Sequence, residues 1–264
     1  MKHKSKFTLV PILLSALVAV PAAAQDDTKA GPYIGLSGGV ALPGDSNNSG
    51  TFDSGVPETD DFGSIPADTD LALETDFDTG YTISGQAGYA FENGFRLELE
   101  AAYTDYDVDS HEELLVGGAN LDGVDSAVLT RGPASGANPL VGDVLADGQG
   151  DVSNFSLFGN VYYDINTGSA FKPYIGAGLG YQWVDVDYQP SGVAIGDDDD
   201  AVFAYQVMAG ASYAVTDTVE LFGQYTYRDT TEDAEIPLTL LPATLGVESQ
   251  QSLLTAGVRV RFGG

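Results

Sequence analysis

Eight segments of the chain alternate apolar and polar residues with a period of two. The clearest covers residues 95–104, where Phe95, Leu97, Leu99, Ala101 and Tyr103 alternate with Arg96, Glu98, Glu100 and Thr104. The others lie near residues 33–42, 81–91, 154–163, 171–183, 203–213, 219–228 and 254–262. Strands that separate lipid from a polar interior alternate in this way for about ten residues. The pattern therefore predicts eight membrane-spanning strands.

The connections between these segments are alternately short and long. Short links lie at residues 92–94, at 164–170 and around Thr216 and Asp217, whereas the long ones cover 41–77, 109–150, 189–200 and 231–247. Outer-membrane barrels have this arrangement, with tight periplasmic turns and extended outer loops. The predicted fold class is all-β: an eight-stranded antiparallel up-and-down transmembrane β-barrel with short periplasmic turns and long extracellular loops, in the bacterial outer membrane.

Aromatic residues at the lipid-facing positions gather at both ends of the segments. Toward the short links lie Tyr89, Phe91, Phe95, Tyr163, Phe171, Tyr213 and Phe262; toward the long links lie Tyr81, Tyr103, Phe155, Tyr181, Trp183, Phe203, Tyr205, Tyr225 and Tyr227. Amphipathic rings prefer the two interfaces of a membrane, so these residues predict two girdles. A soluble eight-stranded barrel is the alternative, but it would turn its apolar face inward and needs no girdles.

Charged residues occupy the inward positions of several segments. They are Arg96, Glu98, Glu100, Glu220, Arg259 and Arg261. The interior of an eight-stranded barrel is only wide enough for side chains to fill it, and buried charges must be paired. We therefore predict a network of ion pairs in the lumen. The alternative, in which the same residues form a charged constriction of a pore, remains open at this point.

The N-terminal segment indicates export, and the net charge excludes nucleic-acid binding. Residues 1–24 combine a basic start, an apolar run at 7–20 and three alanines at 22–24, which predicts a cleaved secretory signal peptide followed by a barrel domain at 25–264. The chain has 39 acidic and 10 basic residues and a formal charge of −29. Nucleic-acid binding requires clustered lysine and arginine, so it is excluded, and no cofactor is expected.

The long connections are rich in acidic residues. Asp197, Asp198, Asp199 and Asp200 form an unbroken run. Clustered carboxylates suit weak binding of Ca²⁺ or Mg²⁺, but the run lacks the glycine and the terminal glutamate of an EF-hand loop. We expect a solvated surface that avoids self-association and no defined metal site.

Two further motifs resemble parts of catalytic or nucleotide-binding sites. His111 lies in "SHEELL", but Leu115 stands where a zinc protease of the H-E-x-x-H type has its second histidine. We predict a solvated loop histidine and no enzymatic activity. "GAGLGY" at 176–181 lacks the features of a nucleotide-binding loop, and we interpret its inward glycines as space for larger side chains opposite.

Several stretches resemble the outer-membrane β-barrel superfamily that includes the transmembrane domain of outer-membrane protein A and the opacity-type surface proteins. They are "YIGLSGG", "NGFRLELEAAYTDY", "KPYIGAGLGYQW", "AYQVMAGASY" with "ELFGQYTY", and "TAGVRVRF". The resemblance implies insertion by the barrel-assembly machinery, with Thr255, Gly257, Val260 and Phe262 matching its recognition signal. Such chains commonly stop at the aromatic residue, whereas Gly263 and Gly264 follow here.

The function expected from these features is a structural and surface-interaction role. The protein would have a charge-paired lumen, display acidic loops and contact outer-membrane lipid and lipopolysaccharide. Divalent cations would bind weakly at those loops. A narrow cation-preferring channel or small-solute porin is the alternative.

Overall fold

The structure is a computed structural model that describes residues 30–146, 150–188, 196–239 and 241–262. The predicted signal peptide and Gly263 and Gly264 lie outside these residues. The elements are β1 (Gly31–Pro43), β2 (Ser46–Phe52), β3 (Asp70–Phe77), β4 (Gly80–Ala90), β5 (Phe95–Val116), β6 (Ala119–Asn120), α1 (Ala127–Thr130), α2 (Val141–Leu145), β7 (Gly150–Asp164), β8 (Phe171–Tyr188), β9 (Gly196–Ala214), β10 (Val219–Thr230), β11 (Ala234–Pro237), β12 (Ala243–Val247) and β13 (Gln251–Arg261).

Eight of these strands close into a ring. Its order is β1, β4, β5, β7, β8, β9, β10 and β13, and every neighbouring pair is antiparallel, including the closing pair of β13 and β1. Each strand contains one of the eight alternating segments, so the predicted eight-stranded antiparallel barrel is confirmed. Neither described helix has the length and hydrophobicity that crossing a bilayer requires.

The two faces of the ring have the predicted polarity. Outward side chains such as Leu36 and Leu99 are 71% and 72% exposed, whereas the inward side chain of Arg96 is fully buried. This is the reverse of a soluble protein, because the surrounding hydrocarbon takes the place of an apolar core. We call the part of the ring between the two aromatic girdles the membrane section.

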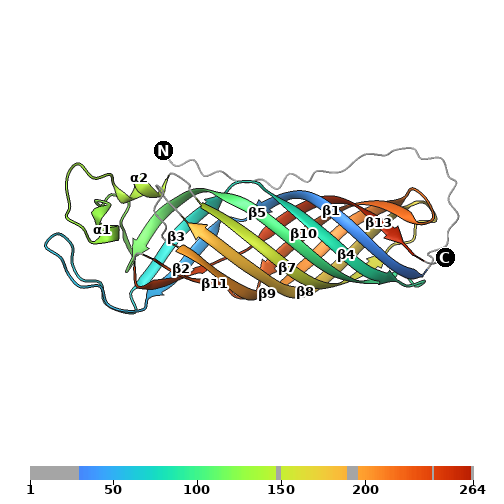
Figure 1. The fold of residues 1–264 in the computed structure, drawn as a ribbon, viewed down its shortest axis with the longest axis horizontal. Coiled ribbons are helices and arrows are strands. Elements are labelled where there is room, and N and C mark those ends of the chain that lie inside the picture. The colour runs from blue at the N-terminus through green and yellow to red at the C-terminus, as the bar shows by residue number, and fades with distance from the viewer. Residues whose placement is uncertain (1–29, 147–149, 189–195, 240, 263–264) are drawn as a thin grey trace.

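The short links are tight turns at one end of the barrel. Between β4 and β5, Phe91 N–H donates to the Phe95 carbonyl at 2.8 Å, and Gly94 adopts a φ of 86°. Only glycine enters that left-handed region without strain. β1 begins and β13 ends at this same end, as an even number of strands requires (Figure 1).

Beyond the outer girdle the ring continues as an ordered extension. β5, β7, β8 and β9 run past the membrane section, and β5 pairs there with β3, which pairs with β2, then β12, then β11 (Figure 1). α1 and α2 lie at the far end. The long connections predicted as loops therefore hold much regular structure, and we call this part the extracellular extension.

Two apolar clusters fill the extracellular extension. The lower cluster, next to the membrane section, consists of Tyr106, Val108, Val152, Val184, Val186, Tyr188, Val202, Ala234, Ile236 and Val247. The upper cluster consists of Phe52, Val56, Leu71, Leu73, Leu114, Val141, Leu145, Ala243 and Leu245. Both belong to strands that arrive from different connections, so packing in the interior holds the extension together.

Candidate functional site

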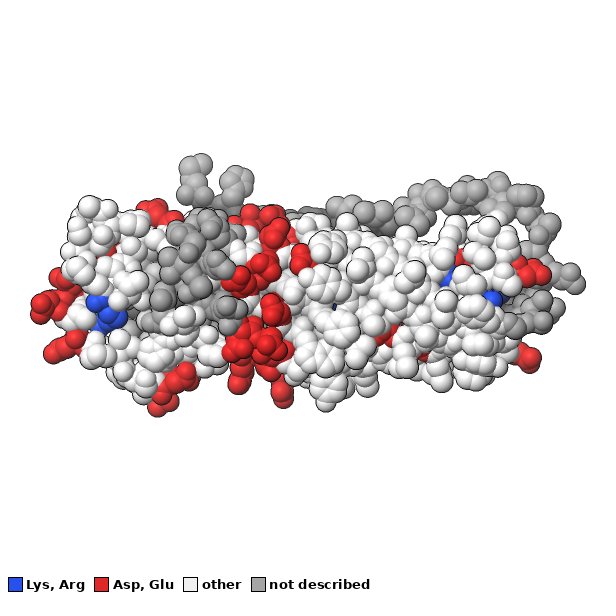
Figure 2. All heavy atoms as spheres, in the orientation of Figure 1, with Lys and Arg blue, Asp and Glu red and all other residues white. Residues whose placement is uncertain are grey.

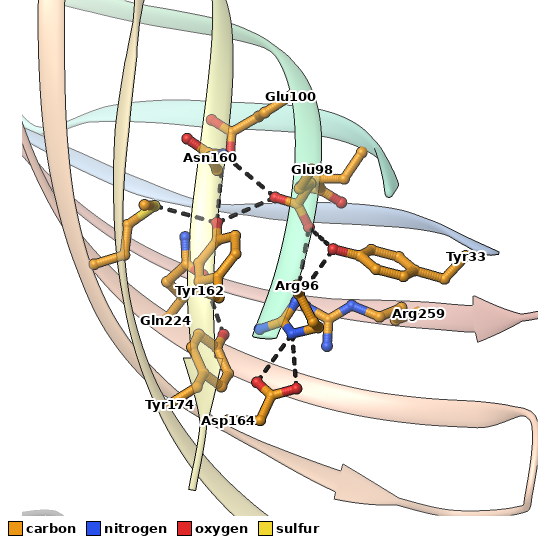
Figure 3. Close-up of polar contacts among 12 residues, drawn as sticks. Tyr33, Arg96, Glu98, Glu100, Asn160, Tyr162, Asp164, Tyr174, Gln224 and Arg259 are labelled. Atoms are coloured by element: carbon orange, nitrogen blue, oxygen red, sulfur yellow. Dashed lines mark hydrogen bonds and ion pairs between the residues drawn. The ribbon is translucent and has the colours of Figure 1, made fainter. Parts of the chain in front are cut away.

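The first group of charges in the barrel interior is centred on Arg96 (Figure 3). Its Nε donates to both carboxylate oxygens of Asp164 at 2.9 Å, and its Nη1 lies 3.8 Å from Glu98 Oε2. Tyr33 donates its hydroxyl hydrogen to the same Glu98 oxygen at 2.8 Å. The side chain of Arg96 is fully buried, so its charge depends on these two carboxylates.

Aromatic rings enclose the same guanidinium group. The Cζ of Arg96 lies 4.4 Å from the ring centre of Tyr162 and 4.9 Å from that of Tyr174. Tyr162 in turn donates to Glu98 Oε1 at 3.1 Å. Cation–π contacts of this kind strengthen when they are removed from water.

A second group joins the last two strands. Glu220 accepts from Arg259 Nη1 at 3.2 Å and lies 2.9 Å from Arg261 Nη2. The pairing of β10 with β13 places Glu220 directly opposite Arg259, so the ion pair follows from the strand register. The guanidinium of Arg259 also lies 5.0 Å from the ring of Tyr33, which links this group to the first.

A third group lies closer to the middle of the barrel. Arg228 Nη2 is 2.9 Å from Glu100 Oε1, and the arginine also donates to Gln206 Oε1 from Nε and Nη2 and to Ser156 Oγ at 3.2 Å. The ring of Phe158 lies 4.6 Å from its Cζ. Every donor branch of this buried guanidinium is thereby engaged.

The three groups together balance their charges. The arginines are Arg96, Arg228, Arg259 and Arg261, and the carboxylates are Glu98, Glu100, Asp164 and Glu220. Their formal charges sum to zero. The structure brings together all six residues that the sequence indicated for the lumen and adds Asp164 and Arg228. Arg228 lies on the inward parity of residues 219–228, so the signal for it was present, whereas Asp164 ends its strand at a turn.

Inward glycines provide the room that these side chains need. A Cβ added at Gly176 would overlap the ring of Tyr162, and one at Gly178 would overlap the side chain of Asn160. The interpretation of "GAGLGY" as a packing feature is confirmed at both positions. The opposite wall carries smaller polar side chains, where Ser37, Ser84 and Gln86 are half-buried and hydrogen-bonded to one another.

Above the third group the polar interior ends at the lower apolar cluster. Gln182 donates to Asn154 at 3.0 Å and to Ser249 at 2.6 Å, and Asn154 reaches the hydroxyl of Tyr106. Tyr106 is itself a member of the lower apolar cluster. The interior therefore changes from paired charges to amides and hydroxyls and then to hydrocarbon.

Acidic side chains form a belt just outside the membrane section, visible as the band of red across the molecule in Figure 2. The sheet register sets Asp107, Asp151 and Asp187 in one row and Asp185 beside Asp199 in the next. We call these five residues with Asp105 the acidic belt. Facing carboxylates on neighbouring strands repel one another.

The acidic belt shifts the ionisation of its own carboxyl groups and lies next to the outer girdle. Burial, followed by the charges of Asp187 and Asp105, raises the pKa of Asp151 above its usual value. Tyr103 of the girdle donates to Asp105 at 2.9 Å. Among the described residues, no group of three or more His, Cys, Asp or Glu side chains has an arrangement that could hold a metal ion.

The run Asp197–Asp200 forms part of β9 and pairs with β8. Asp200 accepts the backbone N–H of Glu235 from β11 at 3.1 Å. Its carboxylate therefore caps a backbone donor at the boundary between β9 and β11. Charged residues at such a boundary discourage further strand pairing.

His111 is not the solvated loop histidine that the sequence indicated. It lies inside the extracellular extension with 1% of its surface exposed, and its Nδ1 is 2.9 Å from Thr75 Oγ1. The prediction was wrong because β5 continues through His111 to Val116, and the shift in its register with β3 between Asp76 and Phe77 turns the side chain inward. Period-two alternation cannot reveal such a bulge.

Comparison with known proteins gives consistent matches. The sequence matches the family described as outer membrane protein beta-barrel domain over residues 11–262. An outer membrane protein of Gluconacetobacter diazotrophicus is 27% identical over 221 residues, which are 79% of this chain and 49% of that protein. The chain thus spans about half the length of the curated relative that it matches.

Solved structures of outer-membrane proteins also match. Neisserial surface protein A has a TM-score of 0.44 and 22% sequence identity, covering 89% of this chain and 99% of its own. OprG from Pseudomonas aeruginosa has a TM-score of 0.49 and 15% identity, covering 90% and 100%. With a closed ring of eight strands and a family match over nearly its whole length, the chain belongs to the outer membrane protein beta-barrel domain family and is a bacterial outer-membrane protein.

Proposed function

We propose that the protein is a closed, non-catalytic membrane anchor that holds a folded β-structured extension at the cell surface. The observation that carries this proposal is the filling of the interior, from the paired charges around Arg96 to the two apolar clusters. A barrel of eight strands has little space beyond its own side chains. The part available to a partner is then the outside of the extracellular extension.

The alternative function is a narrow cation-preferring channel. Half-buried Ser37, Ser84 and Gln86 would favour it, since they leave polar space along one wall of the membrane section. Ions crossing there would still have to break the Arg228–Glu100 pair or pass beside it. They would then meet the lower apolar cluster, where Val184 and Val186 are fully buried. An apolar constriction of this kind opposes ion passage by excluding water.

The position of the acidic belt supports a role at the lipid headgroups. The belt follows directly on the outer girdle, which would put it at the level of the phosphates of lipopolysaccharide. Carboxylates and phosphates repel each other unless a divalent cation lies between them. We therefore include lipopolysaccharide and weakly held Ca²⁺ or Mg²⁺ among the proposed partners.

For assembly, we propose that the barrel-assembly machinery reads the last strand. Thr255 and Gly257 of β13 are on its inward parity and Val260 on its outward parity, with Phe262 just beyond the strand. These residues become part of the closing seam with β1. Their recognition would have to precede that pairing.

Single-channel recording tests the proposal. Protein purified from membranes is incorporated into a planar bilayer at low salt, with insertion verified by the blue-shifted emission of Trp183, the only tryptophan. We expect no current steps. The double variant Glu100→Ala, Arg228→Ala is a matched control that empties the third charge group, and it should also be silent because the lower apolar cluster remains. Reproducible cation-selective steps from the unmodified protein would overturn the anchor proposal.

A further inference from the structure

A polar layer lies between the two apolar clusters of the extracellular extension. It consists of Ser46, Asn48, Thr75 and His111, with the ring of Tyr188 beside it. On β5, His111 lies between Val108 of the lower cluster and Leu114 of the upper cluster. On β3, Thr75 lies between Leu73 of the upper cluster and Phe77, which packs on the lower one. The layer is therefore sealed from water on both sides.

The hydrogen bonds of this layer form a chain from Ser46 to His111. Ser46 donates to Asn48 Oδ1, Asn48 Nδ2 donates to Thr75 Oγ1 at 2.8 Å, and Thr75 Oγ1 lies 2.9 Å from His111 Nδ1. With Asn48 donating to it, the hydroxyl of Thr75 is positioned to donate its own hydrogen to Nδ1. Nδ1 accepts that hydrogen only in the neutral imidazole.

Protonation of the ring would disturb the layer in two ways. The imidazolium carries a hydrogen on Nδ1, which faces the hydroxyl hydrogen of Thr75 and forces that hydroxyl to rotate. It also brings a full charge into a site that is 1% exposed and flanked by hydrocarbon, where a charge is costly. The ring of Tyr188, 4.8 Å away, packs against the imidazole at a steep angle and leaves little room for water.

We propose that His111 is an acid-sensitive latch: protonation of its ring loosens the strands β2 and β3 and opens the extracellular extension between its two apolar clusters. The proposal goes beyond anchoring, and it holds whether or not the barrel conducts. Imidazole is the side chain whose charge changes near neutral pH, at about 6.5 in water. A surface protein with such a latch would present different surfaces in neutral and acidic surroundings.

Other titratable groups surround the layer on the outer face of the wall. β3 carries Glu74 and Asp76, β5 carries Asp109, Glu112 and Glu113, β8 carries Asp187, Asp45 precedes β2 and Glu248 follows β12. β2 itself has none, and Tyr188 is the titratable side chain in ring contact with His111. Burial, followed by the charge of Asp45, raises the pKa of Asp76. Acidification relieves repulsion among these carboxylates, so they act against opening and the effect of His111 must be isolated.

Hydrogen exchange and NMR on the full protein isolate the effect of His111 from that of the carboxylates. Amide protection in β2 and β3 is followed from about pH 7.5 to about pH 5, with correction for free-peptide exchange, while the His111 ring signals are assigned by their loss in His111→Gln. For a latch that takes up one proton on opening, protection falls by up to about tenfold per pH unit. We expect this fall in β2 and β3, a ring titration over the same range, and unchanged protection in β1 and β13.

The variant provides the comparison. His111→Gln keeps a hydrogen-bonding side chain but cannot titrate, so protection of β2 and β3 should stay constant or rise as the pH falls. Equal losses in both proteins, or a ring that stays neutral to about pH 5, would overturn the proposal. If the amides of β2 and β3 in His111→Gln are unprotected already at neutral pH, the unmodified protein alone tests the proposal. A His111 ring that titrates without any loss of amide protection would also refute the latch.

Discussion

Replacing Glu100 with glutamine would leave Arg228 charged but without its ionic partner in the middle of the barrel. The two side chains are 6% and 1% exposed, and their contact atoms are 2.9 Å apart. Glutamine has nearly the same volume, so packing is retained and the change is chiefly one of charge. The substitution therefore measures what the ion pair contributes within an otherwise intact interior.

The expected loss follows from how Arg228 is held. Removing one partner of a buried pair typically costs about 3–5 kcal/mol. Here the guanidinium keeps its bonds to Gln206 and Ser156 and its contact with the ring of Phe158. We therefore expect the lower end of that range, about 3 kcal/mol in the free energy of unfolding.

Urea unfolding in lipid vesicles, followed by the emission of Trp183, provides the assay. Two variants serve as comparisons. Glu92→Gln removes an exposed acid in a tight turn and should change stability by less than about 0.5 kcal/mol. Glu100→Gln with Arg228→Met removes both charges and should recover most of the loss. A loss of less than about 1 kcal/mol in Glu100→Gln alone would mean that water reaches Arg228, which would refute a dry, pair-dependent interior.

Two further predictions concern the belt and the inward glycines. Asp151→Asn should raise the stability of the extracellular extension by about 0.2–1 kcal/mol at neutral pH, because facing carboxylates repel. Since the fold raises the pKa of Asp151 from its usual 3.8, the native protein loses stability as the pH rises through that raised value. The gain in stability should therefore vanish in acid. Urea unfolding of both proteins at neutral and at acidic pH measures it, and a gain that persists in acid would contradict this explanation. Gly176→Leu should prevent refolding because the new side chain would overlap Tyr162, whereas Gly85→Leu, whose side chain points into lipid, should refold. An electrophoretic assay that separates folded from unfolded barrel measures both, and a folded Gly176→Leu would contradict the prediction.

The membrane section was predictable because a barrel wall imposes its two environments on every residue. Lipid outside and paired charges inside give a strict period of two, and the girdles and turn lengths supply orientation. The same rule places Arg228 inside. It gives only one of the two carboxylate partners of Arg96, the inward Glu98. Asp164 comes from the end of a different strand, and only the register of β5 with β7 brings it to Arg96.

The extracellular extension was harder to predict for two physical reasons. β2, β3, β11 and β12 are short, and they are stable only as parts of a sheet whose members come from different connections. β5 also changes its inward parity by register shifts opposite Ala72/Glu74 and Asp76/Phe77, and Glu113 adopts a φ of 52°. A single sequence carries no local sign of these bulges or of the length of β5, so His111 was predicted to be a solvated loop residue.

The seam between β1 and β13 sets the order in which the molecule can form. It places Tyr33 opposite Arg261, so the ring closes only when its first and last strands meet. Closing a loop of that length has a large entropic cost and makes barrel formation slow. Arg259 and Arg261 arrive with the last strand, and until then Glu220 has no cation among its described partners. The interior charges are therefore balanced in the same step that closes the ring. A chain truncated before β13 would neither balance those charges nor close the barrel.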